Sequence, residues 1–238
     1  MTTMPRFILA SGSPRRRKLI ASLGIDFEVI KPDIDEEQRT GESNLAYVTR
    51  LCQEKAQAVL NRLEAGTTAA VLAADTIVVL AADTIGVLPG DRPVGIPTTD
   101  LTRIQLSGQL LGKPRDAADA RAMLHRLRNR AHTVCTAFTL QNTAPVRITH
   151  YVTTAVHMRD YTDAEIEAYI ATGDPFDKAG SYAIQHPGFA PVARIEGCYN
   201  NVIGLPLCEV KRALAAIGWP AITTPEGCDC PPFEPRRL

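Results

Sequence analysis

The chain has 238 residues, and 45% of them are hydrophobic, which is enough for one large α/β domain or two small ones with a real core. Its 26 basic and 26 acidic side chains cancel, so no overall field would collect nucleic acid or an anionic membrane. A strongly anionic ligand must therefore be held by a local cluster, which favours a small polyanion over DNA or RNA.

Targeting and redox signals are weak. The first ten residues lack the long apolar core of a signal peptide, and the longest apolar stretch, residues 69–82, is interrupted by Asp75 and Thr76. We therefore expect a cytoplasmic protein that does not enter a membrane. The six cysteines are scattered apart from Cys228 and Cys230, which predicts reduced, mostly buried thiols and no zinc site.

The first elements are predicted to be a strand, a turn and a helix. Phe7–Ala10 reads as a short buried strand. Ser13 is a good N-cap and Pro14 a good first helical residue, so a helix should run to about Leu23. A second strand is expected at residues 27–30.

The turn before this helix has the groups that bind phosphate. Ser11 and Ser13 supply hydroxyls, Arg15 and Arg16 supply guanidinium groups, and a helix start has free backbone N–H groups. A capped helix with solvated arginines is the alternative that these residues alone leave open.

Residues 43–63 have the apolar spacing of a long helix, with Ser43 as its cap. Lys55 lies inside the apolar stripe, four residues from both Leu51 and Val59. On spacing alone, Lys55 either has a function or directs its ammonium group out to solvent along the helix.

An eight-residue stretch then occurs twice in tandem, as Val71–Val78 and Val79–Gly86, and each copy places an Asp-Thr pair in an apolar run. An ionised carboxylate is costly to bury unless it is paired or bound to a metal, which indicates a chemical role. The two aspartates are separated by roughly 26 Å of extended chain, so only one can serve a given site. The first copy continues into an unbroken apolar strand, which favours Asp75 over Asp83.

The middle of the chain is expected to hold a loop, a helix and two strands. Residues 86–111 are rich in glycine and proline and are predicted to form a mobile flap, followed by Lys113 at a junction with the next helix. That helix should span residues 116–129, and residues 132–140 and 146–158 could pair as neighbouring strands.

Thr162 begins a capping-box pattern for a helix that ends near Gly173. Asp177 and Lys178 then precede a β-like stretch at residues 182–185, and a solvated turn is the alternative for this charged pair. The last helix starts near Leu207. Interleaved strands and helices favour an α/β fold with a mixed sheet, as one domain over residues 1–218 with a Pro-rich tail at residues 219–238.

In this order the motifs resemble the Maf family of nucleoside triphosphate pyrophosphatases, over roughly residues 6–215. The matching motifs are Ser-x-Ser-Pro-Arg-Arg, Asp-Glu, Ala-Asp-Thr, Gly-Lys-Pro, His-x-Val-x-Thr, Asp-Lys-Ala-Gly with Tyr-x-Ile-Gln, and Gly-Leu-Pro-Leu. The resemblance implies an elongated mixed sheet flanked by helices, as in inosine triphosphatases. The chain departs from the family pattern by an insertion at residues 81–111, which contains the second octamer.

The resemblance implies hydrolysis of a nucleoside triphosphate to the monophosphate and pyrophosphate, with Mg²⁺ or Mn²⁺ as the cation. It implies that Asp75, or less favourably Asp83, is the general base, and that Glu36 and Asp75 bind the metal. The substrate-binding positions it implies are Ser11, Ser13, Arg15, Arg16, Lys55, Thr76, Lys113, Asp177, Lys178 and Gln185.

Arg16, Thr76 and Gln185 match the family branch that acts on dTTP and UTP, and a Gln amide can both donate to and accept from a pyrimidine edge. The alternatives are the branch that hydrolyses 7-methyl-GTP and a nucleotide-binding regulator of cell division with little turnover. A nucleic-acid binder using residues 15–18 is disfavoured by the neutral net charge and by only 5% aromatic residues. The family also suggests a homodimer.

Overall fold

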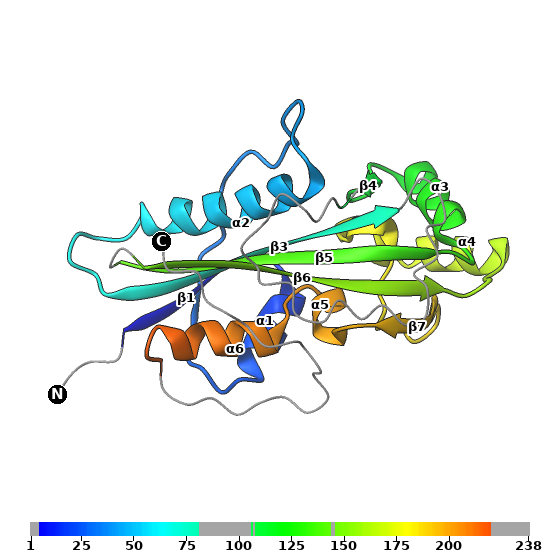
Figure 1. Ribbon diagram of the computed structural model, residues 1–238. Helices are drawn as coiled ribbons and strands as arrows, with labels where there is room; N and C mark the ends of the chain where they lie inside the picture. The colour runs from blue at the N-terminus through cyan, green and yellow to red at the C-terminus, as the bar shows by residue number, and fades with distance from the viewer. Residues whose placement is uncertain (1–4, 81–105, 107, 144–145, 220–238) are drawn as a thin grey trace, which may run out of the picture.

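A long mixed sheet runs through the computed structural model (Figure 1), which describes residues 5–80, 106, 108–143 and 146–219. Within these residues the sheet has seven strands in the order β2-β1-β3-β5-β6-β7, and β4 also pairs with β3. The strands are β1 (Arg6–Ala10), β2 (Glu28–Val29), β3 (Ala69–Leu80), β4 (Gln109–Leu111), β5 (Ala131–Asn142), β6 (Arg147–Met158) and β7 (Val192–Glu196).

Helices cover both faces of the sheet. In Figure 1, α2 lies over one face, while α1, α5 and α6 lie against the opposite face, and α3 and α4 gather at one end with β4 and β7. The helices are α1 (Pro14–Ala21), α2 (Asn44–Leu60), α3 (Ala117–Leu127), α4 (Asp163–Ala171), α5 (Tyr199–Ile203) and α6 (Leu207–Ala216). No helix in the described ranges has both the length and the apolar character needed to cross a bilayer.

The central strand β3 has two different partners along one edge. Residues 69–73 pair in parallel with β1, and residues 78–80 pair antiparallel with β4. Strand β5 runs antiparallel along the other edge, where it pairs with residues 70–79. Residues 74–77, which include Asp75 and Thr76, lie between these two pairings and have no strand partner on this edge.

The side chains of β3 alternate between two buried faces. Ala70, Leu72 and Ala74 pack in the core beneath α1 and α6, whereas Val71 and Ala73 pack toward α2. Because neighbouring side chains on a strand point to opposite faces, this strand reads as a continuous apolar run in the sequence. The same alternation turns Asp75 toward α2 and Thr76 toward α1.

The helix N-caps predicted from the sequence are confirmed. Ser13, Ser43 and Asp116 cap α1, α2 and α3 through their side-chain oxygens, and α4 has the complete capping box of Thr162 and Glu165. The fold class, a mixed α/β arrangement with an elongated helix-flanked sheet, is confirmed as well. The strands expected at residues 132–140 and 146–158 are β5 and β6, which pair antiparallel.

Two expectations fail. Residues 182–185 are not a strand but begin a turn, and the predicted flap at 86–111 ends too late, because Gln109–Leu111 form β4. The short elements β7 and α5 had no predicted counterpart. The second octamer copy after Leu80, with Asp83, and the insertion up to residue 105 lie outside the described residues, as does the Pro-rich tail from residue 220.

Candidate active site

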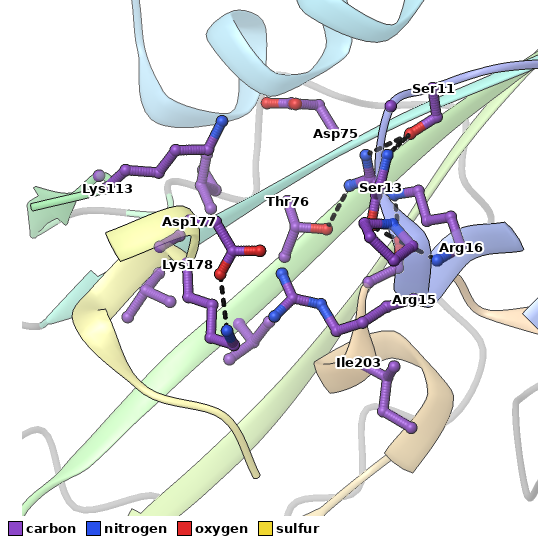
Figure 2. A pocket seen from close by; sticks show the side chains of 18 of the residues that line it. Ser11, Ser13, Arg15, Arg16, Asp75, Thr76, Lys113, Asp177, Lys178 and Ile203 are labelled. Atoms are coloured by element: carbon purple, nitrogen blue, oxygen red, sulfur yellow. Dashed lines mark hydrogen bonds and ion pairs between the residues drawn. The ribbon is translucent and has the colours of Figure 1, made fainter. Parts of the chain in front are cut away.

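A cavity of about 870 Å³ opens at the unpaired edge of β3. Apart from the alternative base Asp83, which lies outside the described residues, every site residue expected from the sequence lines this one cavity: Ser11, Ser13, Arg15, Arg16, Glu36, Lys55, Asp75, Thr76, Lys113, Asp177, Lys178 and Gln185. Figure 2 shows residues 11–16 on one side and Lys113, Asp177 and Lys178 on the other, with Asp75 and Thr76 of β3 between them. The fold thus collects six separate chain segments around one space.

Two carboxylates converge on one buried lysine. Lys55 Nζ lies 2.6 Å from Asp75 Oδ1 and 2.8 Å from Glu36 Oε1. Only 8% of the Lys55 side chain is exposed, against 16% for Asp75 and 47% for Glu36. Lys55 therefore does not extend to solvent, and its position in the apolar stripe of α2 directs it to β3.

The environment of Glu36 favours its ionised form. Burial opposes ionisation of Glu36, but the hydrogen bond and charge of Lys55, with the charges of Lys113 and Arg16, hold its pKa below the usual value. Tyr47 on α2 donates its hydroxyl to the Glu36 carbonyl at 2.7 Å. Burial, together with the nearby negative charge of Asp75 and Glu36, raises the pKa of Tyr47 to about 12, so this hydroxyl keeps its proton.

The start of α1 faces the cavity from the other side. Ser13 accepts the backbone N–H of Arg16 as an N-cap, and its own N–H donates to Ser11 Oγ at 3.2 Å. Pro14 at the first position has no N–H to satisfy. Arg15 extends from this turn into the cavity, as Figure 2 shows.

Arg16 is held by partners from two distant parts of the chain. Its Nε donates to the Gly204 carbonyl at 2.8 Å, and its Nη2 donates to Thr76 Oγ1 at 3.0 Å. Burial lowers the pKa of Arg16, with Asp75 opposing that effect, but an arginine remains charged at neutral pH. The guanidinium group is thus fixed at the cavity wall with some of its donors committed.

Lys178 is buried in a small acidic cluster between two turns of 3₁₀ helix, Asp174–Asp177 and Ala179–Ser181. Its ammonium group donates to the Asp174 carbonyl at 2.5 Å and to the carboxylates of Asp174 and Asp177 at 2.8 and 2.6 Å. All three donors of this lysine are therefore engaged. Lys113 and Gln185, in contrast, reach the cavity from exposed positions.

The protein offers few ligands for a metal ion. Within the described ranges, no group of three or more His, Cys, Asp or Glu side chains is placed to hold one. Glu36 and Asp75 nevertheless present oxygens from different elements to a single cationic position, now taken by the Lys55 ammonium group. This donor set fits a hard divalent cation that completes its shell with phosphate oxygens and water.

Some lining residues were not anticipated from the sequence. Lys31, Tyr47 and Tyr182 line the cavity, and Gly204 supplies a carbonyl to Arg16. Lys31 directly follows the strand expected at residues 27–30, and this position was the one signal in the sequence that could have pointed to it as a lining residue. The contribution of Gly204 depends on a chain reversal after α5, where its φ is +121°, and this reversal has no counterpart in sequence spacing.

A family model and curated relatives both match this chain over most of its length. The sequence model of the family described as "Maf-like protein" matches residues 6–217. A "dTTP/UTP pyrophosphatase" of Anaeromyxobacter dehalogenans is 42% identical over 219 residues, covering 91% of this chain and 96% of the relative. A protein of the same name from Geotalea uraniireducens is also 42% identical, with 92% and 98% coverage.

One solved structure, titled as a nucleoside-triphosphatase / dITP/XTP pyrophosphatase from Mycobacterium abscessus, aligns with 89% of this chain and 97% of its own. It is 16% identical, and the TM-score is 0.38, so it carries no argument about this site.

Proposed function

This chain belongs to the Maf family, and from that membership we propose that it hydrolyses dTTP and UTP to the nucleoside monophosphate and pyrophosphate. The observation that carries the proposal is the cavity, where cationic side chains of several segments gather near the Asp75 carboxylate at the open edge of β3. A triphosphate is the small polyanion that needs such a cluster. The names of relatives at 42% identity support the same substrate class.

The reaction breaks the bond between the α-phosphorus and its bridging oxygen, and it forms a bond from a water oxygen to that phosphorus. Asp75 is proposed to take the proton of the water directly or through a second water. The bridging oxygen leaves with pyrophosphate. Its negative charge would be stabilised by Lys113 and by cationic groups at the start of α1, all of which line the cavity.

A divalent cation, Mg²⁺ or Mn²⁺, fits this proposal. Glu36 and Asp75 would hold it, and two carboxylates plus substrate phosphates are a common environment for Mg²⁺. When bound, the cation supplies positive charge to the phosphate oxygens. Lys55 sits between the same two carboxylates, so we propose that its ammonium group keeps them together until substrate arrives.

Selection of the nucleotide base is proposed to depend on Gln185. Its amide has both a donor and an acceptor for the O4 and N3–H edge of uracil or thymine. Gln185 reaches the cavity from an exposed turn. The family further suggests a cytoplasmic homodimer.

A screen of pyrophosphate release with Mg²⁺ tests the proposal. The substrates are dTTP, UTP, CTP, GTP, ATP and 7-methyl-GTP, and chromatography identifies the nucleotide product. We expect dTTP and UTP to give the fastest release, with monophosphate as the product. Release of inorganic phosphate with a diphosphate product would contradict the reaction. Preference for 7-methyl-GTP would assign the other family branch, and binding without turnover would favour a regulatory protein.

A further inference from the structure

A chain of hydrogen bonds leads from Arg16 into the interior of the protein. Arg16 Nη2 lies 3.0 Å from Thr76 Oγ1, and Thr76 Oγ1 lies 2.9 Å from Thr136 Oγ1. Thr136 Oγ1 in turn donates to the Asn201 carbonyl at 2.9 Å. Thr136 and Asn201 are fully buried, and neither lines the cavity. The chain thus connects a cavity residue of α1 to β3, β5 and α5.

The direction of every proton in this chain follows from its inner end. A backbone carbonyl only accepts, so Thr136 must give its single hydroxyl proton to Asn201. Thr136 Oγ1 can then only accept from Thr76, whose own proton is used in that bond. Thr76 is left with lone pairs alone toward Arg16, and these are what a guanidinium donor requires.

The inner end is fixed by an amide that has all of its partners. Asn201 Oδ1 accepts the backbone N–H of Thr136 at 3.2 Å. Asn201 Nδ2 donates to the Val134 carbonyl at 3.1 Å and to Thr154 Oγ1 at 2.9 Å. These bonds hold α5 to both β5 and β6, so the carbonyl that sets the direction cannot turn away without leaving buried polar groups unpaired.

We propose that Thr136 is a positioning residue for phosphate binding, which acts through Thr76 on Arg16. Its hydroxyl, oriented by the Asn201 carbonyl, makes Thr76 present an acceptor to the guanidinium group, and so turns the remaining Arg16 N–H groups toward the triphosphate. The inference rests on the proposed function, because it assumes a triphosphate in the cavity. In this proposal Thr76 orients Arg16 and does not donate a hydrogen bond to the substrate.

Loss of the Thr136 hydroxyl has a specific consequence. The Thr76 proton then has no acceptor on β5 and can rotate toward Arg16, where two donors would face each other. Arg16 would keep its bond to Gly204 through Nε and a long contact of 3.5 Å from Nη1 to Ser11 Oγ, but it would lose the shorter Thr76 contact at its outer end. Charged hydrogen bonds of this kind correspond to roughly a 10- to 100-fold change in an equilibrium or rate constant.

Three variants test this. Thr136→Val removes the hydroxyl and keeps the shape, and Thr136→Ser restores the oxygen. Thr139→Val is the matched control, because Thr139 is also fully buried on β5, but its hydroxyl lies 3.0 Å from Thr149 Oγ1 and 3.1 Å from Cys52 Sγ, away from Arg16. Each variant is measured for kcat and KM with dTTP, for Tm, and for tripolyphosphate affinity by calorimetry in EDTA.

We expect Thr136→Val to lower kcat/KM and tripolyphosphate affinity by roughly 10-fold or more, while Thr136→Ser stays within about threefold of the wild type. Thr139→Val should match Thr136→Val in its Tm shift without the loss of affinity. Equal losses in both valine variants, an unchanged Thr136→Val, or a serine variant that does not recover would each overturn the proposal.

The two proposals can fail separately. If the wild type does not hydrolyse dTTP, the proposed function fails, and tripolyphosphate affinity alone still decides the part played by Thr136. A wild type that binds no tripolyphosphate would overturn the positioning of Arg16 on a phosphate.

Discussion

Lys55 Nζ lies 2.6 Å from Asp75 Oδ1, across the interface between α2 and β3. Twenty residues separate them in the sequence, and the contact forms because α2 packs over the face of β3 to which Asp75 points. The same ammonium group also binds Glu36. One buried cation therefore holds the Asp75 and Glu36 carboxylates together, and this pairing removes much of the cost of placing Asp75 inside a strand.

Asp75→Asn is expected to lower kcat for dTTP by at least about 100-fold, because the amide cannot take a proton from water. The substitution keeps the shape of the side chain, so the circular dichroism spectrum should be unchanged. Asp83→Asn, in the second octamer copy, is the matched control and should retain nearly full turnover. The reverse result, an inactive Asp83→Asn and an active Asp75→Asn, would move the general base to the second copy.

The two lysines on the far side of the cavity should differ in their effect on stability. Lys178→Met leaves Asp174 and Asp177 without their shared cation. We expect the free energy of unfolding to fall by about 1–3 kcal/mol, which is less than for a fully buried pair because Asp177 is largely exposed. Lys113→Met changes an exposed side chain and should leave the urea midpoint within error. Both variants should lower kcat/KM for dTTP. Equal urea midpoints for the two variants would contradict the buried cluster.

Gln185→Glu should weaken pyrimidine selection by roughly 10-fold in kcat/KM for dTTP and UTP. A carboxylate of the same shape still accepts a hydrogen bond, but it cannot donate one to O4. The comparison substrate is tripolyphosphate, which has no base. If its hydrolysis falls as much as that of dTTP, the loss reflects added negative charge near the phosphates, and Gln185 does not select the base.

His132 predicts part of the pH dependence of stability. Burial lowers the pKa of this histidine from 6.5 to about 3, and its Nε2 lies 2.7 Å from the Tyr182 hydroxyl. Between these two values the unfolded chain binds a proton that the folded protein does not. The contribution of His132 to the free energy of unfolding is therefore fully present above pH 6.5 and falls as the pH decreases toward 3. The slope from this one group is at most about 1.4 kcal/mol per pH unit.

His132→Gln keeps a polar partner for Tyr182 and removes this titration. Urea unfolding at several pH values from 7 to about 4 should therefore show a shallower slope for the variant than for the wild type. His157→Gln is the control, since that histidine is only partly buried and its Nε2 lies 3.1 Å from Glu196 Oε1. A slope for His132→Gln that matches the wild type would mean that His132 is not buried as a neutral ring.

Short-range features of the fold were readable from the sequence because their causes are local. The caps Ser13 and Ser43 act on backbone groups within three residues, and the apolar run of β3 reports burial on both faces. The element boundaries that failed have causes elsewhere in the chain. Residues 109–111 form a strand because β3 leaves a free edge beside them, and no residue within that segment encodes this partner.

The sequence by itself determined which residues could do the chemistry, since phosphate binding and proton transfer need particular side chains and the motifs supply them in order. Only the tertiary structure decided how those residues act together. The break between β1 and β4 along β3 opens the cavity, and strand alternation sends Asp75 to Lys55 and Thr76 to Arg16. The orientation of Arg16 further depends on Asn201, a buried amide 185 positions away, because hydrogen bonds pass their direction through space and not along the chain.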